Sequence, residues 1–543
     1  MAHTTAVPIS PTFPNPHVAH FRAAGSWPQQ SLAALFARTV QRQPARESLI
    51  EGTRRLTFHD LNELVQRAVG GFQSLGLGPG DVIAYQLPNW WEAAVVFLAA
   101  QRLGAIVNPL LPIFRESELR FTLRQSQARA LIIPGIFRGG DHRELVAAVR
   151  GALPALAEVL VVRAEPLSGM RSFATLLDAS PTPAALAPTV DPDSLALLMY
   201  TSGTTAEPKG VLHTHNSLAA EVLSLERVHQ LTPADRTLMP SPLTHISGVI
   251  HGILAPALLG TSAVLMERWE PARAADLIAR ERVTYMIGAP TFLQDLLAEP
   301  PARETRSLRL FSCGGAGVSP ALMQRARERF PNCVAKRVYG STEFPTLTTT
   351  DADDALTHGI DTEGRAIAPA EVRIADAAGN ALPVGAEGEV QGRGPECFVG
   401  YLDARLNADA FTHDGWFRTG DLGVLDAAGY LRITGRLKEI VIRKGEKISV
   451  KEVEDAIAAH PAVAEAVVIP CPDAHTGERT CAVVRLHAGR SIDLESLAAF
   501  LDARGLAKQK WPEQLDVVTD FPRTESGKVL RTRLKERFAG GTK

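Results

Sequence analysis

The sequence predicts an α/β fold in which a large N-terminal domain, made of two βαβ-type subdomains and a β-rich subdomain, precedes a small α+β C-terminal domain. The chain has 543 residues, and at roughly 150 residues per domain it should form about three or four packing units. Helical patterns alternate with short apolar runs in its first part, and short strands separated by turn residues follow. We place the domain boundary between residues 436 and 437.

The βαβ prediction comes from alternation near the N-terminus. The helical pattern of Phe58–Leu75 is followed by the apolar runs Asp81–Gln86 and Ala130–Pro134, as in units built around a largely parallel sheet. The proline-rich stretch Pro181–Pro192 predicts a connector. The apolar run Ser194–Tyr200 then predicts a buried strand that opens a second α/β unit.

The β-rich subdomain is predicted from three short strands, VRIAD, EGEVQGRG and YLRITGR, which are separated by the turn-forming strings AAGN and DAAG. Beyond it, KEIVIRKGEKIS predicts a hairpin. Ser449 and Glu452 have the spacing of a capping box that opens the next helix. The remaining segment has the size of one small domain.

Composition excludes several classes of protein. Hydrophobic residues make up 45% of the chain and charged residues 21%, as in soluble globular proteins. The formal net charge of -2 argues against a polyanion-binding surface, so we expect no nucleic-acid partner. The five cysteines form no CxxC pair and no zinc-like spacing, which favours a reducing compartment.

Targeting and membrane signals are also missing from the pattern. The N-terminal stretch has no basic patch followed by an apolar core, so no secretory signal is expected. The uncharged stretch Ser247–Met266 is interrupted by glycines and Pro256, which suits buried elements better than a transmembrane segment. We expect a cytoplasmic protein. The sequence does not fix the oligomeric state and leaves a homodimer open as an alternative.

Residues Tyr200–Gly210, YTSGTTAEPKG, predict a phosphate-binding loop. Hydroxyls and the backbone N–H groups near Gly203 can donate to phosphate oxygens, and Lys209 adds a positive charge. Any short fragment of this loop would more often be a solvated turn. The spacing differs from that of the Walker loop, which disfavours a kinase or motor NTPase.

The complete loop resembles the signature loop of the adenylate-forming superfamily, which includes acyl-CoA synthetases, peptide-synthetase adenylation domains and luciferases. Further motifs that resemble those of the superfamily follow in order: RVYGSTEF, GWFRTGDLG, ITGR and PRTESGKVLR. Segments over nearly the whole chain, such as RGPECFVGYLD and GERTCAVVRL, are similar to medium-chain acyl-CoA synthetases and cyclohexanecarboxylate-CoA ligases. The resemblance implies that the small C-terminal domain is mobile.

The resemblance also implies roles for the matching residues. The implied catalytic residues are Lys528, Glu343, Thr204 and Lys209, with Glu343 holding Mg2+ and Lys528 bridging the carboxylate and the α-phosphate. Tyr339 would stack on adenine, and Asp421 would accept hydrogen bonds from the ribose. The implied ATP- and AMP-binding set is Thr201, Ser202, Gly203, Thr204, Thr205, Lys209, Gly315, Tyr339, Gly340, Ser341, Thr342, Asp421, Ile433, Arg436 and Lys528.

Adenylation brings a carboxylate to the α-phosphate of ATP, so cations must converge on that phosphorus. After this step a thiol must enter, and the resemblance implies that the small domain rotates about a hinge at Lys438. The hairpin around Gly445 would then help form the channel for coenzyme A, with Lys444 near its entrance. ATP, Mg2+ and coenzyme A as acceptor are the expected cofactors and substrates.

The acyl pocket is expected along PLTHISGVIHG and the glycine-rich CGGAG. No acidic residue occurs from Pro242 to Met266, which disfavours an amino acid substrate. An uncharged lining of small residues favours a medium-chain, alicyclic or aromatic monocarboxylic acid. The implied pocket residues are His245, Gly248, His251, Gly314, Gly315 and Ala316.

The expected function is therefore that of an ATP-dependent carboxylic acid–CoA ligase that acts through an acyl adenylate and releases AMP and pyrophosphate. One alternative is an acyl-AMP ligase that loads the phosphopantetheine of a carrier protein. Another is a non-catalytic nucleotide-binding paralogue, which the presence of Lys209, Glu343 and Lys528 disfavours.

Overall fold

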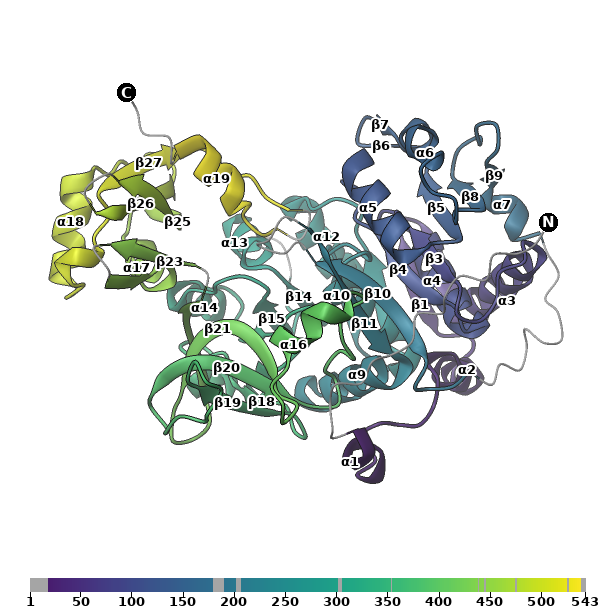
Figure 1. The fold of residues 1–543 in the computed structure, drawn as a ribbon, viewed down its shortest axis with the longest axis horizontal. Helices are drawn as coiled ribbons and strands as arrows, with labels where there is room; N and C mark the ends of the chain where they lie inside the picture. Colours follow the sequence, from purple (N-terminus) through teal and green to yellow (C-terminus); the bar gives the residue numbers. More distant parts are fainter. Residues whose placement is uncertain are drawn as a thin grey trace.

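The computed structural model describes residues 18–178, 190–201, 207–300, 305–352, 354–437, 439–443, 446–473, 476–524 and 527–538. Two large sheets and a helical layer between them form the body of the protein, and two smaller sheets lie at one side (Figure 1). The mixed α/β class predicted from the sequence is confirmed. Most of the expected connector at 181–192 lies outside the described residues.

The first large sheet has nine strands in the order β18-β17-β16-β15-β14-β12-β13-β1-β2. Its central strands, from β16 to β1, run parallel, and the strands at both ends are antiparallel. The strands are β1 Glu47–Glu51, β2 Arg54–Thr57, β12 Arg236–Met239, β13 Ser262–Leu265, β14 Tyr285–Gly288, β15 Leu310–Gly314, β16 Val334–Tyr339, β17 Thr348–Thr349 and β18 Arg365–Ala366.

The second large sheet has seven strands in the order β11-β10-β4-β3-β5-β8-β9, and a two-stranded ribbon, β6 and β7, lies beside it. The strands are β3 Val82–Tyr85, β4 Ile106–Pro109, β5 Ala130–Pro134, β6 Ile136–Phe137, β7 Gly140–Asp141, β8 Glu158–Val162, β9 Arg171–Ser172, β10 Leu195–Thr201 and β11 Lys209–Thr214.

The division of the chain between these two sheets differs from the sequence prediction. The strand expected to open a second α/β unit is β10. It pairs with β4 in the seven-stranded sheet, which otherwise consists mainly of strands from the N-terminal part of the chain. Conversely, β1 from the N-terminal part pairs with β13 of the later sheet. The two subdomains therefore exchange strands. Apolar patterns identify strands, but they carry no information about which strands pair.

Helices form three layers around the two sheets. The middle layer packs α2 Leu32–Arg42, α3 Phe58–Ser74, α4 Trp91–Leu103, α9 His215–His229, η1 Val249–Leu254 and α11 Ala255–Leu259 against both sheets. The outer layers are α12 Pro271–Glu281, α13 Pro290–Ala298 and α14 Pro320–Arg329 on the nine-stranded sheet, and α5 Glu116–Ser126 and α6 His142–Arg150 on the seven-stranded sheet. Shorter elements are α1 Val18–Ala23, α7 Phe173–Leu176, α10 Ile246–Gly248, α15 Ala355–His358, η2 Ala404–Leu406 and α16 Asn407–Ala410.

The predicted β-rich subdomain is a four-stranded antiparallel sheet, β19 to β22 in order. Register shifts interrupt the pairing of β21 with both neighbours, which is a common arrangement beside functional sites. The strands are β19 Glu371–Ala375, β20 Glu387–Arg393, β21 Phe417–Leu425 and β22 Leu431–Arg436.

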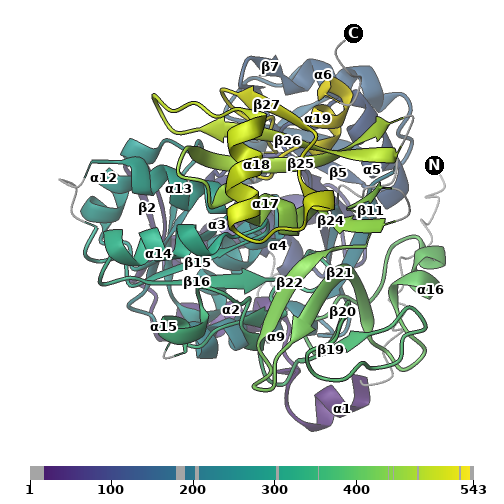
Figure 2. The ribbon, with the colours of Figure 1, turned by 90° about the vertical axis from the view of Figure 1, so that its left-hand side faces the viewer.

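The C-terminal part is a five-stranded sheet with helices on both faces. It lies above the four-stranded sheet in both ribbon views (Figures 1 and 2). The predicted hairpin is formed by β23 and β24, and the Ser449 side chain caps α17 by accepting from the Glu452 N–H. Its elements are β23 Ile440–Arg443, β24 Glu446–Ser449, α17 Val450–Ala458, β25 Val463–Asp473, β26 Gly477–Leu486, α18 Leu494–Ala503, η3 Lys508–Lys510, β27 Gln514–Val518 and α19 Arg531–Phe538.

Two cysteines that the sequence spacing did not pair are joined in this sheet. Cys471 on β25 and Cys481 on β26 form a disulfide, with Cα atoms 6.1 Å apart. The antiparallel pairing of the two strands brings them together, whereas the other three cysteines are free and buried. Among the described residues, no helix is long and apolar enough to cross a membrane. The stretch Ser247–Met266 instead forms buried short helices and strand β13.

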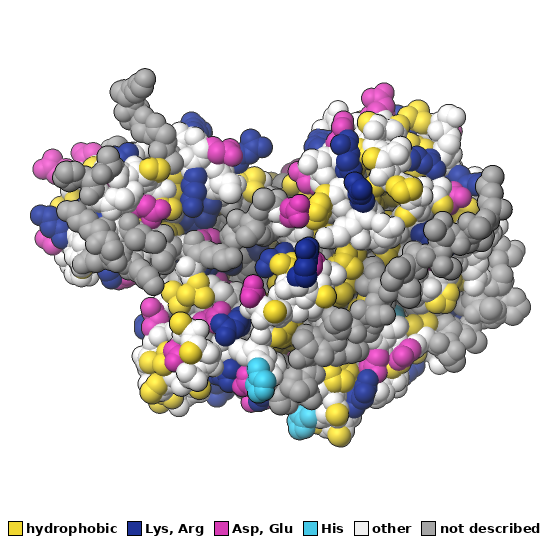
Figure 3. All heavy atoms as spheres, viewed as in Figure 1, with side chains coloured by type: hydrophobic (Ala, Val, Ile, Leu, Met, Phe, Trp, Pro, Cys, Tyr) yellow, Lys and Arg dark blue, Asp and Glu magenta, His cyan; other side chains and the backbone are white. Residues whose placement is uncertain are grey.

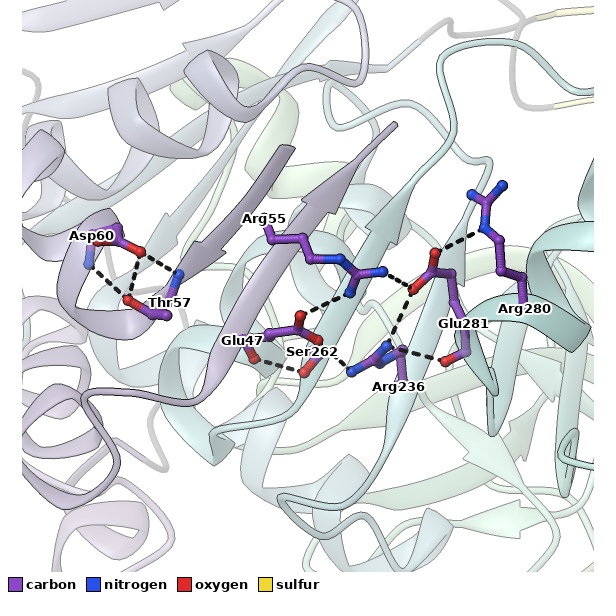
Figure 4. Close-up of polar contacts among 8 residues, drawn as sticks. All are labelled: Glu47, Arg55, Thr57, Asp60, Arg236, Ser262, Arg280 and Glu281. Carbon is purple, nitrogen blue, oxygen red and sulfur yellow. Dashed lines mark hydrogen bonds and ion pairs between the residues drawn. The ribbon is translucent and has the colours of Figure 1, made fainter. Parts of the chain in front are cut away.

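An ion-pair network ties the edge of the nine-stranded sheet to α12 (Figure 4). The Glu281 carboxylate, which is only 2% exposed, receives Arg55 at 2.7 Å, Arg236 at 3.4 Å and Arg280 at 3.0 Å. Glu47 pairs with Arg55 at 2.8 Å and with Arg236 at 2.7 Å. The network therefore links β1, β2, β12 and α12 around one buried carboxylate.

We expect Glu281→Gln to lower the midpoint of thermal unfolding by about 2–6 °C, because the neutral amide leaves three guanidinium groups without their shared anion. The matched control is Glu116→Gln on α5, which removes an exposed pair with Arg120 at 3.7 Å and should change the midpoint by less than about 1 °C. Equal midpoints for the two variants would show that the network does not stabilise the sheet edge.

Candidate functional site

The predicted phosphate loop connects two paired strands. Thr201 at the end of β10 pairs with Lys209 at the start of β11, so a tight antiparallel hairpin presents the intervening loop. The predicted residues Ser202, Gly203, Thr204 and Thr205 lie outside the described residues. The position of the two strand ends fixes where the loop leaves and re-enters the sheet.

A tyrosine, an aspartate and an arginine meet at the junction of β16, β21 and β22. The Tyr339 hydroxyl donates to Asp421 Oδ2 at 2.7 Å, and Arg436 Nε lies 2.7 Å from Asp421 Oδ1. Asp421 is in the middle of β21. Burial and the Asp421 charge raise the pKa of Tyr339, which remains a neutral hydrogen-bond donor. Both oxygens of Asp421 therefore point toward this junction.

The motif around Glu343 folds as a compact turn, and no helix begins at Ser341. The Tyr401 hydroxyl donates to Glu343 Oε1 at 2.8 Å. Lys209 Nζ lies 5.0 Å from the centre of the Tyr401 ring, within the range of a cation–π contact. Tyr401 therefore connects the lysine of the phosphate loop with the carboxylate predicted to hold Mg2+.

A buried histidine supports this turn. His213 Nε2 donates to the Thr342 carbonyl at 2.8 Å, and its Nδ1 lies 3.1 Å from the Ser217 hydroxyl. Burial lowers the pKa of His213 to about 4, so the ring is neutral and its two nitrogens have opposite roles. Gly340 allows the turn to close, because a Cβ there would lie 2.1 Å from the Pro345 carbonyl oxygen.

Lys528 from the C-terminal domain reaches the same region. Burial and the charge of Arg436 lower the pKa of Lys528, while Glu343 and Asp421 act in the opposite direction. The lysine thus lies within the field of two carboxylates of the N-terminal domain. Its Cε would be 3.5 Å from a Cβ placed on Gly315, which has φ of +78°. That separation is an ordinary van der Waals contact, so it is the positive φ that favours glycine at this position.

The Lys528 loop is seated on α13. A Cβ at Gly527 would lie 2.5 Å from Thr291 Oγ1 and 3.3 Å from Ala289 Cβ, so the backbone of Gly527 packs closely against these two side chains of the N-terminal domain. Burial raises the pKa of Asp295 on α13, whereas the charges of Arg485 and Arg523 from the C-terminal domain act to lower it.

The predicted acyl-pocket residues divide into two groups. His245 caps α10. Burial and the charge of the nearby Lys528 lower the pKa of His245 to about 3, so its ring is neutral. Gly315 lies beside Lys528, whereas Ala316 is exposed. His251 is deeply buried on η1 beside Tyr285, and the glycines at 248 and 314 allow backbone approach to Pro242 and Val338.

The remaining predicted residues are placed in part. The Ile433 N–H donates to Glu363 Oε2 at 2.8 Å, which anchors β22 to a carboxylate that also binds Arg337. The predicted hinge Lys438 and the predicted channel residues Lys444 and Gly445 lie outside the described residues. No group of three metal-ligating side chains occurs in the described part of the chain. Mg2+ usually binds through one or two carboxylates together with substrate phosphates, and the single carboxylate of Glu343 fits that donor set.

Two sequence profiles match this chain to a known family. The profile described as AMP-binding enzyme matches residues 36–402, and the profile of the AMP-binding enzyme C-terminal domain matches residues 452–528. The chain belongs to the AMP-binding enzyme family. The superfamily resemblance inferred from the motifs is therefore confirmed for this AMP-binding enzyme.

Individual relatives align over nearly the whole chain. The AMP-binding enzyme is 36% identical over 534 residues to the medium-chain fatty-acid–CoA ligase of Escherichia coli (strain K12), covering 97% of this chain and 94% of the relative. It is 32% identical over 531 residues to a Streptomyces protein named salicylyl-CoA synthase / salicylate adenylyltransferase, covering 96% of each. Among solved structures, ATP-bound MatB from Rhodopseudomonas palustris has a TM-score of 0.84 at 29% identity, covering 94% of this chain and 99% of MatB.

Two members of the site were not singled out by sequence reasoning. Tyr401 occurs in the segment RGPECFVGYLD, but nothing in its pattern indicates a contact with Glu343. His213 lies on β11 just beyond the phosphate loop, and its bond to Thr342 depends on tertiary packing. The only sequence signal for either residue is its proximity to a motif.

We expect Asp421→Asn to weaken AMP binding by about 10- to 100-fold, because the amide loses the charge that pairs with Arg436 and one acceptor oxygen for the ribose. Isothermal titration calorimetry with AMP measures this change. The control is Asp426→Asn in the exposed turn between β21 and β22, where the carboxylate accepts from the Ala428 and Tyr430 N–H groups. Equal AMP affinity for Asp421→Asn and the control would exclude Asp421 from the nucleotide site.

Proposed function

We propose that this AMP-binding enzyme is an ATP-dependent carboxylic acid–CoA ligase. In the first step a carboxylate oxygen of the acid attacks the α-phosphate of ATP, and pyrophosphate leaves. In the second step the thiol of coenzyme A attacks the acyl carbon, and AMP leaves. The observation that carries the proposal is the convergence of Lys528 on Glu343, Asp421 and Arg436 from the other domain.

The first step requires charge neutralisation, because an anionic acid approaches a polyanionic nucleotide. Lys528 would contact both the acid carboxylate and the α-phosphate, and Lys209 would hold the β- and γ-phosphates. Binding of ATP would restore the pKa of Lys528 toward its usual range, since added negative charge favours the ammonium form. Each well-placed cation supplies about 3 kcal/mol of transition-state stabilisation.

The nucleotide would be positioned by the β21 and β22 junction. Asp421 would exchange its contact with Tyr339 for the ribose hydroxyls, while Arg436 keeps the carboxylate charged and oriented. Mg2+, when bound at Glu343, would supply further positive charge to the phosphates. The Tyr401 bond to Glu343 Oε1 holds that carboxylate in one orientation toward Lys209.

The second step requires that Lys528 leave. We propose that the boundary between the domains lies between residues 436 and 437, with Lys438 as the hinge. The lysine loop contacts Thr291 of α13 through Gly527, which itself has no side chain, and this suits a contact that is broken on each cycle. Glu439 lies 3.8 Å from Arg436 and 3.5 Å from Arg531, so the chain near the hinge is tied to both domains by ion pairs.

The acid is proposed to be a monocarboxylic acid with an apolar body, of medium-chain, alicyclic or aromatic type. Apolar side chains of Met239, Ile287 and Val338 face the middle helical layer below Gly314. The names of the E. coli and Streptomyces relatives, one a medium-chain fatty-acid ligase and one a salicylyl-CoA synthase, support the medium-chain and aromatic types. Coenzyme A is the proposed acceptor, and a carrier protein is the competing acceptor in the test below.

We expect Lys528→Ala to slow acid-dependent pyrophosphate release by about 100-fold or more while changing thioester formation from supplied acyl adenylate by less than about threefold. The two half-reactions are measured separately with a panel of carboxylic acids. Lys508→Ala, on an exposed turn of the same domain, is the control and should match the wild type in both.

Two results would contradict the proposal. Equal loss of both half-reactions in Lys528→Ala would show that the lysine does not act in adenylation alone. Multiple turnovers with a carrier protein and none with coenzyme A would identify a carrier-loading enzyme instead.

A further inference from the structure

A layer of buried polar side chains lies between α9, η1 and the face of the nine-stranded sheet that carries Gly314. Its members are His229 on α9, His251 on η1, Tyr285 on β14, Ser312 on β15 and Lys336 on β16, and each is at most 2% exposed. Of this set, only His251 belongs to the acyl-pocket residues expected from the sequence. Such a concentration of polar groups is unusual inside an otherwise apolar core.

The layer lies at a defined depth below the candidate site. Ser312 pairs with Ile287 and Lys336 in register, and it precedes Gly314 by two residues on the same face of β15. Two residues of a strand span about 7 Å. Along the opposite wall, the helical turns from His245 to His251 rise about 7–9 Å. Both walls therefore reach the polar layer at a similar distance from Lys528 and His245.

Several atoms of the layer lack partners. Within the described part of the chain, no hydrogen-bond partner is present for His251 Nδ1, Ser312 Oγ or either ring nitrogen of His229. The rings of His251 and Tyr285 have centroids 6.1 Å apart. A buried polar group that is left without a partner destabilises the folded protein. Tyr285 pairs with Leu310, two residues further from Gly314 than Ser312, so the polar side chains come from successive rows of this sheet face. Several unpartnered groups gathered there favour a ligand that satisfies them.

The buried lysine completes the layer. Lys336 Nζ donates to the Val228 carbonyl at 3.2 Å and to the Thr350 carbonyl at 2.5 Å. It forms no ion pair with any residue that the structure describes. These two bonds leave one of its three N–H donors for another acceptor.

The layer is suited to a neutral oxygen atom. Burial lowers the pKa of His251 to about 3, and burial together with Lys336, His251 and Arg309 lowers that of His229 well below its usual value. Both rings are therefore uncharged at neutral pH, and each offers one donor and one acceptor nitrogen. Burial lowers the pKa of Lys336 to about 7, against the opposing charge of Asp351.

We propose that this layer binds a hydroxyl or keto oxygen at the far end of the acid, about six to eight carbon atoms from the carboxylate. The proposal rests on the proposed ligase function and specifies its substrate class. The carboxylate end lies at Lys528, the apolar body passes Ile287 and Val338, and the oxygen accepts from His229, His251 or Lys336. A plain fatty acid of the same length would leave these groups unpaired, which is the basis for its rejection.

The test compares octanoate with 7-oxooctanoate by kcat/KM for pyrophosphate release. Wild-type enzyme should prefer 7-oxooctanoate by about tenfold or more, and His251→Leu should reduce that preference by about tenfold. Ser312→Ala, a smaller change, should reduce it by about threefold. The preference is a ratio measured on one sample, so it does not depend on the fraction of folded enzyme.

The matched control is His142→Leu, which removes an equally buried imidazole that is already paired with Gln86 at 3.1 Å. This variant should keep the wild-type preference. A preference for octanoate in the wild type, a ratio unchanged in both His251→Leu and Ser312→Ala, or a preference for octanedioate over both acids would overturn the inference. Activation of neither eight-carbon acid would also overturn it, whereas activation of other acids in that case would leave the proposed ligase function intact.

Discussion

The position of Lys528 organises the site, because a cation carried by one domain is held among charged groups that belong to the other. Asp421 and Glu343 attract the lysine, Arg436 opposes it, and burial disfavours its charge. The local field is therefore balanced closely enough that a bound nucleotide can shift it. In the proposed mechanism the lysine would withdraw once the α-phosphate has reacted, and among the residues that the structure describes it forms no ion pair that would have to be broken.

The architecture of the sheets explains how such distant residues meet. Gly288, Gly314 and Tyr339 are the last residues of the adjacent parallel strands β14, β15 and β16, so the carboxyl ends of these strands lie next to one another. The β21 strand brings Asp421 to these strand ends, and the β10–β11 hairpin presents the phosphate loop. On the surface shown in Figure 3, acidic and basic side chains are interspersed, and no large patch of one sign is visible.

The sequence predicted the fold class and many of the individual elements, because periodicity and turn residues are local signals. It placed β5 at Ala130–Pro134 and α3 within one residue of its observed end. It assigned β10 to the wrong sheet and made no prediction for β1, since strand exchange between sheets depends on long-range pairing. Motifs brought together Tyr339, Glu343, Asp421, Arg436 and Lys528. Tyr401, His213 and the layer around Lys336 could not be predicted, because buried contacts between remote elements leave no local pattern.

The alternation of Lys528 between two positions is tested most directly by a cross-link at the contact between the lysine loop and α13. A Cβ at Gly527 would lie 3.8 Å from Thr291 Cβ, close to the usual separation of about 3.8 Å in disulfides. We expect the oxidised Thr291→Cys/Gly527→Cys variant to keep acid-dependent pyrophosphate exchange. Its thioester formation from supplied acyl adenylate should fall by about 100-fold and return on reduction, with the single variants as controls. Thioester formation at the rate of the reduced protein, in a fully cross-linked sample, would contradict this account.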